Sequence, residues 1–105
     1  ASKHALVGLS KSAALELASD QIRVNCVCPS SVDTPMANAD GGEDLLAAEK
    51  LLVPLGRICA PEEAAALIHF LASPESAFVS GQAIMLDGGM SAGTSAAAFD
   101  KLAQS

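Results

Sequence analysis

The sequence predicts an α/β fold in which parallel strands lie between layers of helix. Two long segments with helical periodicity, 3–19 and 61–71, alternate with two short apolar segments, 22–28 and 82–86. Hydrophobic residues make up 50% of the chain, which is far more than a disordered acidic protein contains. At 105 residues the chain has the size of one small domain. We therefore expect two long helices, two strands and one short helix in the loop between them.

Residues 3–19 form the first predicted helix. One of its faces carries, at helical spacing, Lys3, Val7, Ser10, Ala14 and Leu17. The start of a helix favours acidic side chains, but the first turn here holds Lys3 and His4. The pattern therefore predicts a helix that begins upstream of Ala1 and ends at residues 19–21.

Residues 22–28 form the first predicted strand. Val24, Cys26 and Cys28 face one way and Val27 faces the other, so both faces are apolar. This is typical of a parallel strand that is covered on both sides. Pro29 ends the strand because it has no N–H to donate.

The three cysteines are predicted to be buried, reduced thiols. Cys26 and Cys28 lie on one face of the strand, about 6.6 Å apart by strand rise, which is poor geometry for a disulfide. Zinc needs more ligands than these, and His4 and His69 are not spaced to supply them with Cys59. We expect no metal site and a reducing compartment.

Residues 36–55 are predicted to leave the core as an excursion. Asn-Ala-Asp-Gly-Gly at 38–42 is a flexible break, after which Asp40 and Glu43 have the spacing of a capping box. A short helix is expected over 43–52, and Pro-Leu-Gly at 54–56 turns the chain back.

The second long helix is predicted to start at Pro61, a favoured first helical residue, and to stop before Ser73. On this helix His69 is interpreted as a packed or interface histidine. The strand 82–86 is closed by the turn Asp-Gly-Gly at 87–89. The last residues, 92–105, are rich in Ala and Ser and are expected to form a mobile tail with at most a weak helix near Phe99.

Charge and hydropathy exclude several classes of partner. The net charge is −6 and no basic stripe exists, so we expect no nucleic acid. No apolar run approaches the roughly 20 residues that cross a bilayer, so we expect no membrane span. No secretory signal is present, and we expect a cytoplasmic location unless a targeting segment lies upstream.

Six groups of short motifs follow one another along the chain. They are Ala-Ser-Lys at 1–3, Arg-Val-Asn at 23–25 with Pro29, Val-x-Thr-Pro-Met at 32–36, Pro-Leu-Gly-Arg at 54–57 with Pro-Glu-Glu at 61–63, Phe-Leu-Ala-Ser at 70–73 with Phe-Val-Ser-Gly-Gln at 78–82, and Asp-Gly-Gly at 87–89. Over residues 1–91 this succession resembles the C-terminal half of short-chain dehydrogenase/reductases. The resemblance implies the C-terminal portion of one Rossmann-like, doubly wound parallel sheet that binds NAD(P), with 36–55 as its substrate loop.

The resemblance implies that Lys3 is catalytic and also binds the nicotinamide ribose. In the family a tyrosine lies four positions before this lysine, which here falls two residues upstream of Ala1, and the chain contains no tyrosine. Residues four apart on a helix are neighbours, and an ammonium beside a phenol lowers the pKa of the phenol. A phenol tuned in this way exchanges a proton with an alcohol or ketone more readily.

The segment Pro29–Thr34 is implied to bind the cofactor. By resemblance, the Val32 backbone contacts the nicotinamide carboxamide, and the Thr34 hydroxyl contacts the carboxamide or the pyrophosphate. Met36 opens the implied substrate loop. The family commonly has glycine where this chain has Ser30, and we interpret the difference as a tuning of the nicotinamide pocket. Arg57 is interpreted as a structural ion-pair residue.

The resemblance thus implies a fragment of an NAD(P)-dependent oxidoreductase that moves a hydride between the nicotinamide and a secondary alcohol or ketone. The choice between NAD and NADP stays open, because the residue that makes it would lie upstream. The full-length protein is expected to form a homodimer or homotetramer. A catalytically silent fragment or oligomerisation module is the alternative, and a reductase of fatty-acid synthesis is a third possibility.

Overall fold

The computed structural model describes residues 2–33 and 42–93, together with 96, 100 and 103, with the Glu43 side chain excepted. Two strands pair side by side, β1 (Cys26–Pro29) and β2 (Ala83–Leu86). The strands are parallel, because the Cys26 N–H donates to Gln82 and the Ser30 N–H donates to Leu86. The predicted α/β class with a parallel sheet is confirmed.

The chain divides into two compact units. The first comprises residues 1–28 and 65–85, and the second comprises 29–64 and 86–105.

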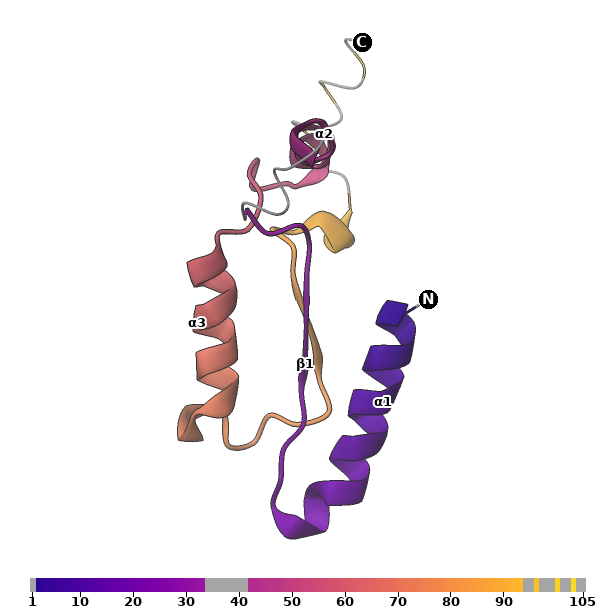
Figure 1. Ribbon diagram of the computed structural model, residues 1–105, viewed down its shortest axis with the longest axis vertical. Coiled ribbons are helices and arrows are strands. Elements are labelled where there is room, and N and C mark those ends of the chain that lie inside the picture. Colours follow the sequence, from indigo (N-terminus) through magenta and orange to yellow (C-terminus); the bar gives the residue numbers. More distant parts are fainter. Residues whose placement is uncertain (1, 34–41, 94–95, 97–99, 101–102, 104–105) are drawn as a thin grey trace. The chain divides into compact units, whose positions relative to one another are not determined.

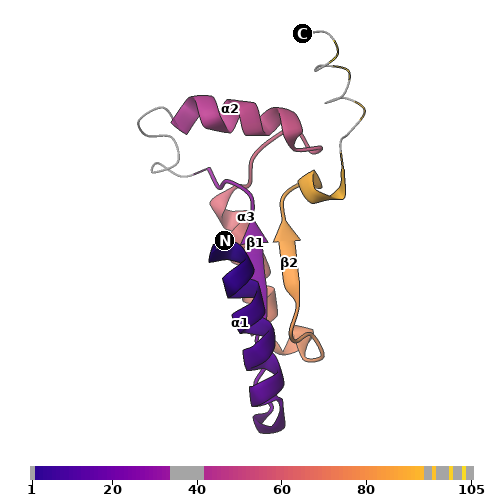
Figure 2. The same ribbon diagram turned by 90° about the vertical axis from the view of Figure 1, so that its right-hand side faces the viewer.

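In the first unit, helix α1 (Ser2–Leu17) and the part of α3 (Pro61–Ala72) from residue 65 onward lie on opposite sides of the strands (Figures 1 and 2). Helix α1 passes into a 3₁₀ turn at Ala18–Asp20, and Gln21 ends it in the left-handed conformation with φ of 61°. The predicted end at residues 19–21 is therefore confirmed. The Gln21 N–H donates to the Ala18 carbonyl at 2.9 Å, which closes the turn.

The predicted strand 22–28 begins too early, because β1 starts only at Cys26. The preceding residues bond to the end of α3 and to the loop after it instead of to β2. Arg23 Nη2 donates to the carbonyls of Leu71 and Ser73 at 3.0 and 3.2 Å, and its Nη1 donates to the Val79 carbonyl at 3.0 Å. A cation at these carbonyls also suits the negative end of the α3 dipole.

Ser76 completes this network as the most deeply buried polar residue of the described chain, at 1% exposure. Its hydroxyl accepts a hydrogen bond from Arg23 Nη1 at 3.1 Å and can donate to the Phe70 carbonyl at 2.9 Å. Asn25 adds two further bonds, from its amide nitrogen to the Val79 carbonyl and from the Gln82 N–H to its amide oxygen. Side-chain hydrogen bonds therefore hold residues 23–25 in place, where a longer strand would use backbone hydrogen bonds to β2.

Cys26 and Cys28 are buried on one face of β1, with their sulfur atoms 3.8 Å apart. All three cysteines are free, as expected. Cys59 is only half-buried, so the expectation of burial is wrong for that thiol. His69 is exposed in the described structure, so it is not packed against the described residues, and its interface role stays a prediction.

In the second unit, helix α2 spans Gly42–Leu52, within one residue of the predicted 43–52. Leu46 and Val53 anchor it and are 8% and 3% exposed. Val53 lies over the turn 87–89, where a Cβ built on Gly88 would meet Val53 Cγ1 at 2.6 Å. Only glycine fits there, because Gly88 also has φ of +61°.

Several sequence predictions lie outside the described residues. The Asp40–Glu43 capping box, most of the tail 92–105 and the weak helix near Phe99 are among them. A 3₁₀ turn at Met90–Ala92 ends the continuous described chain. None of the helices in the described ranges has the length and apolar character needed to cross a bilayer.

Candidate functional site

Lys3 lies in the first turn of α1, and its side chain is exposed. Helix α1 runs antiparallel to β1, so its start lies toward the carboxyl end of that strand (Figure 1). The charge of the Lys3 ammonium interacts electrostatically with the Cys28 thiol of β1. Burial raises the pKa of the Cys28 thiol, its bond with Cys26 raises it further, and the charge of Lys3 partly opposes both. A positive charge thus lies where open α/β sheets bind their ligands.

The predicted cofactor segment starts at Pro29, the last residue of β1, whose side chain is exposed. Thr34 and Met36 lie outside the described residues, so their predicted roles stay predictions. Lys3 belongs to the first unit, whereas Pro29 and Val32 belong to the second. The described part of the predicted site in the second unit is therefore the loop 29–33.

Val32 forms a parallel bridge with Cys59. The bridge uses the neighbours of Val32: the Cys59 N–H donates to the Ser31 carbonyl at 3.4 Å, and the Asp33 N–H donates to the Cys59 carbonyl at 2.8 Å. In a planar trans peptide the C=O and the N–H point in opposite directions. The Val32 N–H and C=O, which belong to these same two peptides, therefore point away from Cys59. Within the described chain neither group has a hydrogen-bond partner.

Two further contacts hold this loop in place, and a third fixes the segment that follows helix α2. The Ser30 N–H donates to the Leu86 carbonyl at 3.1 Å, which extends the strand ladder past Pro29. The Ser31 N–H donates to Glu49 Oε1 on helix α2 at 3.0 Å. The segment just after helix α2 is in turn tied to the turn 87–89, because the Leu55 N–H donates to the Gly88 carbonyl at 3.2 Å. Reasoning from the sequence missed Glu49, because nothing in the sequence distinguishes it from the other two acids of this short helix.

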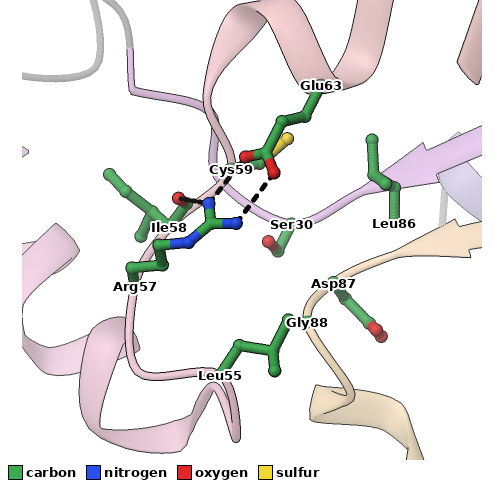
Figure 3. Close-up of a pocket in the computed structure, with 9 residues that line it drawn as sticks. All are labelled: Ser30, Leu55, Arg57, Ile58, Cys59, Glu63, Leu86, Asp87 and Gly88. Carbon is green, nitrogen blue, oxygen red and sulfur yellow. Dashed lines mark hydrogen bonds and ion pairs between the residues drawn. The ribbon is translucent and has the colours of Figure 1, made fainter. Parts of the chain in front are cut away.

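A small pocket of about 80 Å³ lies behind the loop (Figure 3). Its wall is made by Ser30, Leu55, Arg57, Ile58, Cys59, Glu63, Leu86, Asp87 and Gly88. Ser30, where the resemblance led us to expect glycine, is half-buried in this wall. Its side chain therefore contributes to packing behind the loop in the described structure. The Asp87 carboxylate turns away from Arg57 and accepts hydrogen bonds from the N–H groups of Gly89 and Ser91.

Arg57 and Glu63 form a two-pronged ion pair in this wall. Arg57 Nη1 and Nη2 donate to the two carboxylate oxygens of Glu63 at 2.6 and 2.8 Å (Figure 3). Glu63 also accepts the Ala60 N–H at 2.9 Å, which caps the first turn of α3. The Arg57 hydrogen bonds, with help from Ala60, lower the pKa of Glu63 to about 2. The interpretation of Arg57 as a structural ion-pair residue agrees with this geometry.

Among the residues that the structure describes, no three His, Cys, Asp or Glu side chains are grouped to hold a metal ion. The Val32 amide groups do suit the carboxamide of a nicotinamide, which carries one hydrogen-bond acceptor and an NH₂ donor. The loop therefore offers main-chain groups to a ligand. A sequence motif indicates such groups only indirectly, through the residues around them.

Residues 1–91 match the family profile described as enoyl-(acyl carrier protein) reductase. Over 91 residues the chain is 54% identical to a short-chain dehydrogenase of Aspergillus ruber, a match that covers 85% of this chain and 33% of that protein. The chain belongs to the short-chain dehydrogenase/reductase family. It is also 45% identical over 91 residues to the 3-oxoacyl-[acyl-carrier-protein] reductase of Chlamydia muridarum, covering 86% of this chain and 36% of that protein.

Solved structures of short-chain dehydrogenases share the fold. A family member from Mycobacterium marinum aligns with a TM-score of 0.80 at 40% identity, over 88% of this chain and 35% of that one. The aldohexose dehydrogenase of Thermoplasma acidophilum aligns with a TM-score of 0.77 at 37% identity, over 89% of this chain and 40% of that one. The chain spans about a third of the length of the curated short-chain dehydrogenases that it matches.

Proposed function

We propose that this chain is the C-terminal part of an NAD(P)-dependent oxidoreductase that acts on a secondary alcohol or ketone. The observation that carries the proposal is the Val32 amide pair, which points away from Cys59 and has no partner in the described chain. One donor and one acceptor, side by side on a loop after a parallel strand, complement the carboxamide of a nicotinamide. When bound, the nicotinamide would supply the hydride chemistry, and this loop would orient the ring.

Lys3, on helix α1 of the first unit, would supply positive charge for the proton exchange. Its charge acts on the Cys28 thiol of β1, and it would act on a phenol four positions earlier on the same helix. The phenol would then hold its proton less tightly and exchange it with the substrate oxygen at neutral pH. This role requires a tyrosine, and none occurs among these 105 residues. The oxidoreductase is therefore proposed for a longer protein that carries this chain.

The relatives suggest substrates without deciding between them. One is named as a 3-oxoacyl-[acyl-carrier-protein] reductase and one solved structure as an aldohexose dehydrogenase. The first name specifies a ketone substrate and the second a sugar, so we propose the general reaction at an alcohol or ketone carbon and leave the substrate open. The choice between NAD and NADP also stays open.

An association module is the second candidate, and one observation favours it. Helix α1 and the loop at 80–81 line an apolar hollow of about 410 Å³ on the first unit. Leu15 in this hollow is 82% exposed, which suits contact with a second copy of the chain. We propose that the full-length protein is a homodimer or homotetramer, and that a chain without the tyrosine would at most associate.

The Val32→Pro substitution tests the oxidoreductase proposal in the full-length protein. Proline removes the Val32 N–H, which bonds nothing in the described chain, so the bridge to Cys59 keeps its hydrogen bonds. We expect the Kd for NADH or NADPH, measured by fluorescence titration, to rise roughly tenfold, about the value of one hydrogen bond. Val32→Ala keeps the amide and should weaken binding far less. Wild-type protein that binds neither dinucleotide would contradict the oxidoreductase and favour the association module.

A further inference from the structure

Glu49 is the one side chain of α2 that the described structure shows bonded to the loop 29–33. Its Oε1 accepts the Ser31 N–H at 3.0 Å, and the residue is half-buried. A carboxylate that accepts a backbone N–H makes a charge-assisted hydrogen bond, which is stronger than a bond between neutral groups. Among the described residues the ion pair shown is Arg57–Glu63, so no cation competes for Glu49.

Helix α2 offers a fixed point from which Glu49 can act. Leu46 on the helix and Val53 just after it are buried, and Val53 fills the space over Gly88. The Val53 N–H donates to the Glu49 carbonyl at 3.2 Å, which extends the helical bonding past Leu52. The backbone of Glu49 is therefore fixed through Val53, which bonds to the Glu49 carbonyl and packs against the turn 87–89.

The hydrogen bond of Glu49 falls on the peptide just before the one that carries the Val32 N–H. The peptide between Ser30 and Ser31 is held by Glu49, and the next peptide is held by Cys59 through the Ser31 carbonyl. Because each peptide is planar, two such contacts restrict the rotation of the Ser31 backbone between them. The direction of the Val32 N–H depends on that rotation.

We infer that Glu49 is a positioning residue that fixes the Val32 amide for the nicotinamide carboxamide. The inference rests on the proposed function, because it assigns the support of the same loop. Glu49 touches neither cofactor nor reacting atoms in this role. It couples the substrate-loop helix to the cofactor loop, so dinucleotide affinity depends on an acid in a segment otherwise assigned to substrate.

The test compares Glu49→Ala and Glu49→Gln in the full-length protein. Glu49→Ala removes the acceptor, and we expect the Kd and the KM for the dinucleotide to rise about tenfold while kcat falls less than threefold. Glu49→Gln keeps an oxygen at the same reach and should restore the Kd to within threefold of wild type. Asp44→Ala is the matched control, because it removes an exposed carboxylate from the first turn of the same helix, and it should leave the Kd unchanged.

A role limited to stability would give a different result. Glu49→Ala would then lower the Tm and the yield of active protein but leave the dinucleotide Kd at the wild-type value, and that outcome overturns the inference. Where Glu49→Ala does not fold, Glu49→Asp shortens the reach by one methylene and should raise the Kd, whereas Glu49→Gln does not. Wild-type protein without dinucleotide binding would instead overturn the proposed function, so the two failures are distinguishable.

Discussion

The Arg57–Glu63 pair shows how one exposed contact can set the acid stability of a turn. Glu63 is the third residue of α3, where its carboxylate accepts the Ala60 N–H and faces a guanidinium. Ala60 has no side-chain oxygen to cap the helix, so Glu63 supplies the only side-chain cap in this turn that the described structure shows. The lowered pKa of Glu63, about 2, follows from these two contacts.

The pKa of Glu63 gives a pH-dependent prediction. Because the folded pKa lies below the ordinary 4.5, the contribution of Glu63 to stability is fully present above about pH 4.5 and is lost as the pH falls through about 2. Glu63→Gln should therefore lower the Tm of the full-length protein at pH 7, and the difference from wild type should vanish near pH 2. The measurement is thermal unfolding across this pH range.

Glu62→Gln is the control, because Glu62 stands on the same turn with no hydrogen bond in the described chain. It should change the Tm little at any of these pH values. A difference between Glu63→Gln and wild type that stays constant from pH 7 to 2 would contradict the assigned role. Solvent screening keeps the effect small in either case, because the pair is exposed.

At the scale of elements, helix α2 and the turn 87–89 hold each other in place. The turn approaches so closely that a methyl group at Gly88 would meet Val53 Cγ1 at 2.6 Å. The same contact holds the end of the helix whose Glu49 supports the loop 29–33. A substitution in this turn should therefore affect cofactor binding as well as stability.

Gly88→Ala and Gly56→Ala separate the two costs of replacing a left-handed glycine. Both glycines have positive φ, +61° and +79°, but a Cβ on Gly56 meets nothing within 4 Å. Gly56→Ala should cost about 1 kcal/mol for the backbone conformation alone. Gly88→Ala adds the overlap with Val53 and should cost roughly 2–4 kcal/mol in total. Denaturant unfolding of the full-length protein measures both, and equal losses would exclude the overlap as a cause.

The sequence predicts the helices better than it predicts the first strand or the details of the site. The start of α3 follows from Pro61 and its acidic first turn, and the end of α1 follows from residues 19–21. The predicted strand 22–28 begins too early because its apolar pattern hides the bonds of Arg23 and Asn25 to the end of α3 and the loop after it. Those bonds join residues about 50 positions apart, which no local pattern records.

The candidate site likewise contains residues that the sequence predicts and residues that it does not. Lys3 and Pro29 were marked by motifs, and the structure places them at the start of α1 and the end of β1. The direction of the Val32 amide depends on its register against Cys59, which lies 27 positions later, and the role of Glu49 depends on how α2 folds back. Both depend on tertiary contacts, so a single sequence could suggest the first only through family resemblance and could not reveal the second.

For the molecule as a whole, the described chain encloses little apolar core. Five hydrophobic residues are buried in the described ranges, namely Ala14, Cys26, Cys28, Leu46 and Val53. Large apolar side chains such as Leu9, Leu15 and Phe78 are exposed, and Phe78 is fully so. The described sheet has only two strands, and two strands alone are marginally stable in water.

The isolated 105-residue chain should therefore fold poorly. We expect a broad, non-cooperative thermal transition, binding of a hydrophobic dye, and rapid hydrogen exchange at the β1 and β2 amides, because both outer strand edges lack partners in the described chain. The full-length protein, measured in parallel, should melt cooperatively. A sharp two-state melt of the isolated chain with protected strand amides would show that these elements suffice for a stable fold.

The bridge between Val32 and Cys59 also bears on how this position can vary among relatives. If main-chain atoms bind the nicotinamide, the side chain at position 32 is under weak selection. Only proline is excluded there, because it has no N–H. Substitutions there should accumulate by drift among proteins that bind the same cofactor. The chemically decisive position would then be among the more variable ones in the loop, and its neighbours would carry the visible signature.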